Sequence, residues 1–108
     1  MKKDFDQISN DCSRLVTRKY STSFSLAVKM LSPKIRGAIY NIYGFVRFAD
    51  EIVDSFHNYD KERLIKKFEA DYYEALEDGI SLNPILNAFQ QTVMDYQIPN
   101  DLVQAFLK

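Results

Sequence analysis

Turn-forming residues are sparse and widely spaced in this chain. Its 108 residues include three glycines and three prolines. The clearest breaks are separated by stretches long enough for a helix, and they are Ser32-Pro33, His57-Asn58, Asp78-Gly79, Asn83-Pro84 and Pro99-Asn100. Strand-rich folds need a turn after every few residues, so this spacing predicts an all-α fold of about six helices in one small domain.

Cap residues indicate where several helices begin and end. Ser32 before Pro33 is typical of a helix start, and Asn83 before Pro84 repeats the pattern. Gly79 suits the position just past a helix end. With the spacing of the apolar residues, these signals predict helices over about 4–18, 24–30, 33–55, 61–77 and 84–96, and another from Asp101. The apolar positions of the first helix are Phe5, Ile8, Cys12, Leu15 and Val16.

Composition and charge exclude several classes of protein. Hydrophobic residues make up 46% of the chain and charged residues 27%, a balance typical of folded globular domains. The net charge is -1 and the basic residues are spread along the chain, so we expect no nucleic-acid binding. The single Cys12 excludes an intramolecular disulfide, and neither a signal peptide nor a membrane span is recognisable. We therefore expect a cytoplasmic protein.

The segment 39–56 carries a polar row on a largely apolar helix. At helical spacing, Tyr43, Arg47, Asp50 and Asp54 fall in one stripe. The stripe beside it is apolar and contains Ile39, Ile42, Val46, Ala49 and Val53. A helix this apolar is normally buried, and buried charges are costly unless they are paired or bound to metal. The row therefore needs a binding partner, or it lines a wet, polar cavity.

Two partners suit this row. Asp50 and Asp54 lie one turn apart and can aim both carboxylates at one Mg²⁺ ion, while Arg47 can bind phosphate oxygens. The alternative is an internal row of ion pairs, in which Arg47 pairs with Glu51 four residues later. The spacing alone leaves both alternatives open.

A second polar feature is the hydroxyl-rich segment Tyr20-Ser21-Thr22-Ser23. Hydroxyl and backbone N–H groups before a helix can donate to an anion. They can equally serve as the ordinary N-cap of the next helix.

The two polar features together resemble the N-terminal region of the squalene/phytoene synthases. The first motif reads Tyr20-Ser21-Thr22-Ser23-Phe24. The second follows about twenty residues later and has the form Tyr-x-x-x-Arg-x-x-Asp-[Asp/Glu]-x-x-Asp, with Tyr43, Arg47, Asp50, Glu51 and Asp54 at its named positions. The pair at this separation is far more specific than either motif alone, and the resemblance covers essentially the whole chain. It is nearest to bacterial phytoene synthases.

The resemblance implies a role for each matching residue. Asp50 and Asp54 would bind Mg²⁺, with Glu51 assisting through water. Arg47 and Tyr43 would contact the substrate diphosphate, as would the segment from Tyr20 through Ser21 and Thr22 to Ser23. Asp50, Asp54, Arg47 and Tyr43 form the implied catalytic set, and Phe24 would line the isoprenoid tunnel.

The resemblance also implies a fold and a reaction. The fold would be part of an isoprenoid-synthase helix bundle. The reaction would be the head-to-head condensation of two prenyl diphosphates, with geranylgeranyl diphosphate giving phytoene through a cyclopropyl intermediate in carotenoid biosynthesis. A squalene or dehydrosqualene synthase using farnesyl diphosphate is the near alternative. Release of a lipid product leads us to expect peripheral contact with a membrane.

One departure from the family pattern sets a limit on activity. Relatives carry a second aspartate-rich motif on a later helix, and no second Asp-x-x-x-Asp arrangement follows Gly79 here. We therefore interpret residues 1–108 as the N-terminal segment of a single synthase domain, truncated at its C-terminus and inactive alone. The rival from another class is a non-catalytic helical module.

Overall fold

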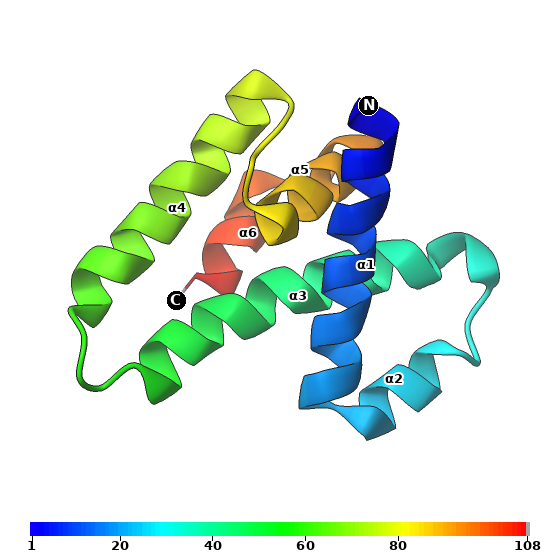
Figure 1. Cartoon of the computed structure of the whole chain (residues 1–108), viewed down its shortest axis with the longest axis horizontal. Coiled ribbons are helices and arrows are strands. Elements are labelled where there is room, and N and C mark those ends of the chain that lie inside the picture. Colours follow the sequence, from blue (N-terminus) through cyan, green and yellow to red (C-terminus); the bar gives the residue numbers. More distant parts are fainter. Residues whose placement is uncertain (108) are drawn as a thin grey trace.

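The computed structural model describes residues 1–107, and within that range all regular structure is helical. Figure 1 shows the order and arrangement of the helices. Their bounds are α1 Lys2–Tyr20, α2 Thr22–Val28, α3 Pro33–Ser55, α4 Lys61–Asp78, α5 Pro84–Tyr96 and α6 Asn100–Phe106. The prediction of an all-α fold of about six helices is confirmed for residues 1–107.

The expected caps form at three helix ends. The Ser32 hydroxyl accepts a hydrogen bond from the Lys34 backbone N–H, and the Asn83 side chain accepts two from the first turn of α5. Gly79 follows α4 with a φ of 74°, a left-handed conformation that glycine adopts without strain. These local signals fix the starts of α3 and α5 and the end of α4.

The hydroxyl-rich segment is shorter than expected, because only Ser21 lies outside a helix. Tyr20 is the last residue of α1, and Thr22 and Ser23 form the first turn of α2. Ser21 is extended, with φ -151° and ψ 95°, and its side chain accepts from the Phe24 N–H at 3.1 Å. One capping residue is therefore enough to separate the two helices. Helix α6 likewise begins at Asn100, one residue before the predicted start.

Helix α1 crosses α3 through small side chains. Its fully buried residues are Ser9, Ser13 and Thr17, while Ile8 and Leu15 remain 55% and 47% exposed. A Cβ atom added to Gly44 of α3 would lie 3.1 Å from the Ser13 hydroxyl oxygen. The glycine thus lets the two helix backbones approach closely, and this explains why α1 buries hydroxyl residues rather than its larger apolar ones.

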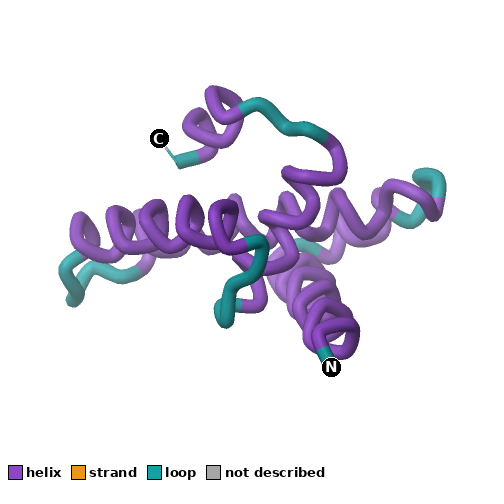
Figure 2. Tube along the Cα trace, turned by 90° about the horizontal axis from the view of Figure 1, so that it is seen from above, coloured by secondary structure: helices purple, strands orange, loops and turns teal. Residues whose placement is uncertain are grey.

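Phe45 stands at the centre of the hydrophobic core. Its ring stacks on Phe89 of α5 at a centroid distance of 3.9 Å and on Phe68 of α4 at 5.2 Å. Tyr72 of α4, Leu86 of α5 and Val103 of α6 are also fully buried in this cluster. Figure 2 shows the start of α1 and the helix α6 on opposite sides of the molecule. Among residues 1–107, no helix is both long and apolar enough to cross a bilayer.

Candidate functional site

Helix α3 has two sides of different character. The packed side carries Phe45, Ala49 and Ile52, which are all buried. The opposite side, called the open side here, carries Tyr43, Arg47, Asp50 and Asp54. Asp50 and Asp54 are exposed, whereas Tyr43 and Arg47 are partly buried. The predicted row exists, and it lies outside the core, on a face where Asp50 and Asp54 reach solvent.

Arg47 is held by two neighbours. Its guanidinium donates to the Glu51 carboxylate at 2.8 Å, and its Cζ atom lies 4.8 Å from the centre of the Tyr20 ring. This brings the end of α1 against the middle of α3, with the Arg47 and Glu51 side chains 23% and 21% exposed. Within residues 1–107, the buried Arg47 Nε has no hydrogen-bond partner. The guanidinium is thus oriented while part of its donor capacity stays unused.

The contact between Arg47 and Glu51 shifts the pKa of both groups. Burial acts to lower the pKa of Arg47, but the hydrogen bond and charge of Glu51, with smaller contributions from the charges of Asp50 and Tyr20, outweigh it and raise that pKa. The pKa of Glu51 is lowered, first by the nearby Ser55 hydroxyl and then by Arg47. Burial raises the pKa of Tyr20, and the negative charge of Glu51 adds to the effect. Both partners of the pair therefore stay charged at neutral pH.

Asp50 and Asp54 take no part in this pairing. In the described part of the chain, neither carboxylate makes a salt bridge or a side-chain hydrogen bond. The open side therefore contains one of the ion pairs that the sequence allowed, Arg47 with Glu51, and leaves two carboxylates unpaired. A fully self-paired row does not form.

The hydroxyl-rich segment lies beside the same face of α3. The ring of Phe24 in α2 stacks on Tyr43 with centroids 5.0 Å apart and an angle of 21° between the rings. The Ser21 side chain caps α2, as the capping alternative required, while Thr22 and Ser23 are exposed. The two sequence motifs, about twenty residues apart, thus meet through a pair of aromatic rings.

The carboxylates of Asp50 and Asp54 suit one hard cation, and the described residues offer no larger group of metal ligands. Within residues 1–107 there is no group of three or more histidine, cysteine or acidic side chains that could hold a metal ion. Two unpaired carboxylates one helical turn apart nevertheless match the usual protein share of a Mg²⁺ site, in which waters and substrate phosphates complete the octahedron. Asp50 and Asp54 therefore fit Mg²⁺ together with a phosphate-bearing ligand.

A cavity of about 380 Å³ lies between α3 and α4. Glu51, the partner of Arg47, is one of its lining residues. Its wall is mainly apolar and its rim contains Tyr20, Glu51, Lys67 and Asp71; the apolar lining residues are Phe48, Ile52, Phe56, Leu64 and Phe68. The sequence patterns gave no indication of this cavity. Asp50 and Asp54 do not line it, so it is separate from the predicted metal position.

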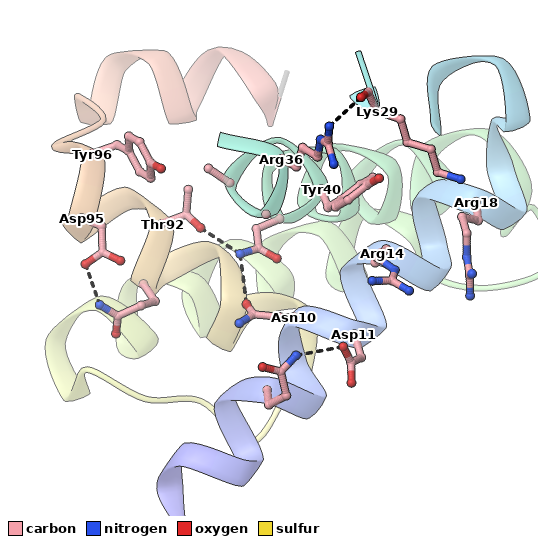
Figure 3. Close-up of a pocket in the computed structure, with 15 residues that line it drawn as sticks. Asn10, Asp11, Arg14, Arg18, Lys29, Arg36, Tyr40, Thr92, Asp95 and Tyr96 are labelled. Atoms are coloured by element: carbon pink, nitrogen blue, oxygen red, sulfur yellow. Dashed lines mark hydrogen bonds between the residues drawn. The ribbon is translucent and has the colours of Figure 1, made fainter. Parts of the chain in front are cut away.

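A larger cavity of about 680 Å³ is lined by residues of α1, of the first half of α3 and of α5 (Figure 3). At its base, Asn41 donates to Asn10 at 3.1 Å and to Thr92 at 3.0 Å, which ties α3 to α1 and α5. Its cationic lining residues are Arg14, Arg18, Lys29 and Arg36. None of the predicted site residues lines this cavity. The stretch from Cys12 to Ala49, which contains these cations, has no acidic residue. That absence was the sequence signal that could have indicated this cavity.

Comparison with known families agrees with this geometry. The family model described as squalene/phytoene synthase matches residues 17–108, which include both motifs and the whole open side. The chain belongs to the squalene/phytoene synthase family. Membership implies a prenyltransferase-type enzyme that acts on prenyl diphosphates, in a family that generally depends on divalent metal. Neither a curated protein nor a solved structure matches the chain.

Proposed function

We propose that the open side of α3 forms a diphosphate-binding half-site for the head-to-head condensation of prenyl diphosphates. The observation that carries the proposal is the unpaired state of Asp50 and Asp54 beside an oriented Arg47. Unpaired like charges on one helix face do not stabilise a fold. Their arrangement is explained by a cation and an anion that bind together.

Each residue of the half-site has a proposed task. Asp50 and Asp54 would hold Mg²⁺, with Glu51 reaching it through water, and the bound ion would neutralise charge on the leaving diphosphate. Arg47 would donate hydrogen bonds to phosphate oxygens through the N–H groups that Glu51 leaves unused. Tyr43 would donate a hydrogen bond from its hydroxyl to the same diphosphate. Tyr20 would keep the guanidinium in place through its ring.

The second motif would complete the anion site and begin the apolar part of the pocket. Thr22 and Ser23 expose hydroxyls on the α2 turn next to Tyr43, whereas the Ser21 hydroxyl is already used as a cap. The stacked rings of Phe24 and Tyr43 would shield the prenyl chain from water. Exclusion of water matters because water would quench an allylic cation.

Calorimetric titration of the chain with inorganic pyrophosphate tests the half-site. We expect binding in the presence of Mg²⁺ and its loss when EDTA replaces the metal. Asp50→Asn should abolish the Mg²⁺-dependent part. Asp78→Asn is the matched control, because Asp78 is also an exposed helical aspartate with an acidic residue, Glu74, four positions earlier. Equal loss in both variants, or binding that ignores Mg²⁺, would favour the non-catalytic module.

Substrate length is the finer part of the proposal. We favour geranylgeranyl diphosphate over farnesyl diphosphate, that is, a phytoene synthase over a squalene or dehydrosqualene synthase. Competition between non-reactive thio analogues of the two substrates measures the preference. With a single acidic motif, we further propose that residues 1–108 alone give no product, and a turnover assay with both substrates checks this.

A further inference from the structure

The charge of the chain is divided unequally along its length. Between Cys12 and Ala49 there are seven basic residues and no acidic ones. All fifteen acidic residues lie outside that span. The folded span comprises the second half of α1, all of α2 and most of α3. A net charge near zero therefore conceals one strongly positive region.

The positive region contains a cluster of exposed apolar residues around a single turn. We call residues 26–36, where α2 ends and α3 begins, the α2–α3 corner. Met30 is 88% exposed and Leu26 58%, and Leu31 and Ile35 are 40% and 38% exposed. Figure 1 shows the corner at one end of the molecule, with α4 at the other. Four large apolar side chains thus reach solvent at one tip of the protein.

Hydrogen bonds hold the corner in a fixed shape. The Arg36 side chain donates to the Leu31 carbonyl at 3.0 Å and to the Lys29 carbonyl at 2.7 Å, on either side of Met30. The Met30 N–H itself donates to the Ala27 carbonyl at 3.1 Å. Met30 is therefore presented outward from an anchored backbone, rather than exposed because the turn is loose.

Cations lie near this apolar tip in the sequence and along the adjoining cavity. Lys29 and Lys34 flank Met30 in sequence and are exposed. Arg14 and Arg18 project from α1 and line the same cavity as Lys29, as Figure 3 shows. In residues 1–107, none of these four side chains forms a salt bridge. Their charges are therefore available to an external anionic surface.

We infer that the α2–α3 corner docks onto the surface of an anionic lipid bilayer. Met30 and Leu26 would enter the boundary between headgroups and acyl chains, and the surrounding cations would bind lipid phosphates. A free phosphate compound would need the cations but not an anchored, exposed methionine. The combination of an apolar tip and a cationic border is what distinguishes a bilayer surface. This inference does not depend on the proposed diphosphate chemistry.

Co-sedimentation with lipid vesicles tests the inference, with EDTA present so that the proposed Mg²⁺ site makes no contribution. We expect the chain to bind vesicles of phosphatidylglycerol in phosphatidylcholine, to bind pure phosphatidylcholine weakly, and to dissociate as salt is raised. Each lysine removed, in Lys29→Gln and Lys34→Gln, should weaken binding about fivefold. Met30→Glu should weaken it about tenfold or more, because it puts an anion where the apolar tip enters.

Matched controls keep the result specific to the corner. Met94→Glu alters another exposed methionine, and Lys66→Gln removes a lysine that pairs with Glu62 on α4. Both controls should bind vesicles like the parent chain, and circular dichroism should show all variants folded. Equal losses in controls and corner variants would overturn the inference, as would absence of binding. Displacement of the chain from vesicles by inorganic pyrophosphate would also overturn it, because the cations would then form a phosphate site.

Discussion

On the packed side of α3, Phe45 is fully buried between aromatic rings of α4 and α5, whereas on the open side Asp50 and Asp54 are exposed and have no side-chain partner among residues 1–107. Both sides belong to one continuous helix, Pro33–Ser55, so the contrast does not come from secondary structure. It comes from what each side contacts. The packed side is filled by side chains of α4 and α5, whereas the open side leaves two carboxylates without a partner among residues 1–107.

The contrast separates stability from binding. Residues on the packed side should control the free energy of unfolding and affect ligands little. Residues on the open side should contribute little to the free energy of unfolding, and their charges should even lower it. They should nevertheless control the proposed binding of Mg²⁺ and pyrophosphate. Substitutions chosen from the two sides can therefore break or sharpen the comparison.

Phe45→Ala should have the largest effect on stability. It removes the ring at the centre of the core and leaves a cavity among Phe68, Tyr72 and Phe89, which should lower the free energy of unfolding by about 3–5 kcal/mol. Urea denaturation followed by circular dichroism measures the change. Phe24→Ala is the control, since Phe24 of α2 stacks on Tyr43 of the open side and is 38% exposed, and it should cost about 1 kcal/mol or less. Similar losses in both variants would remove the distinction between the two sides.

Gly44→Leu should come next, because it separates α1 from α3. A Cβ atom at Gly44 already lies 3.4 Å from the Ser13 Cα, a backbone atom that cannot move aside cheaply. We expect a loss of about 3 kcal/mol from overpacking. Gly37→Leu in the same helix is the control, because nothing lies within 4 Å of a Cβ there. That variant should be stabilised by about 0.5–1 kcal/mol through helix propensity. A thermal melt of each protein distinguishes these outcomes.

Tyr72 of α4, which packs against Phe45 on the packed side of α3, should cause a loss of stability in alkali. Burial, with the neighbouring Tyr73, raises the pKa of Tyr72 from 10.0 to about 12. Above pH 10 the unfolded chain loses this proton and the folded chain keeps it, so stability falls as pH rises towards 12. The loss should reach about 2 kcal/mol. Urea titrations of the parent chain and Tyr72→Phe across this range check it: the phenylalanine variant should lack this part of the decline, and parallel curves would contradict the assignment.

The helices could be predicted from the sequence because their signals are local. Ser32 and Asn83 cap the helices that follow them, and Gly79 adopts the left-handed conformation that its position requires. The row of Tyr43, Arg47, Asp50 and Asp54 was also predictable, since residues of one helix share a face by periodicity alone. Such statements need no knowledge of which elements pack together.

Contacts between distant segments could not be predicted in this way. Nothing in the spacing of α1 shows that it would bury Ser9, Ser13 and Thr17, because that face is selected by the close approach at Gly44. The placement of the Tyr20 ring against Arg47 likewise depends on how α1 crosses α3. The pairing of Arg47 with Glu51, by contrast, was one of two alternatives that the sequence left open.

Asp54→Asn should have the smallest effect, and that effect should have the opposite sign. Asp54 faces Asp50 one turn earlier and lies at the negative end of the α3 dipole, so removing its charge should stabilise the chain by about 0.5 kcal/mol. Asp78→Asn should give a similar gain, because Asp78 ends α4 and has Glu74 four residues before it. The two variants should differ once Mg²⁺ and pyrophosphate are added. The ligands should raise the melting temperature of the parent chain and of Asp78→Asn, but not that of Asp54→Asn. A ligand-induced rise that survives in Asp54→Asn would show that the open side does not hold the metal, even if its charges oppose folding as expected.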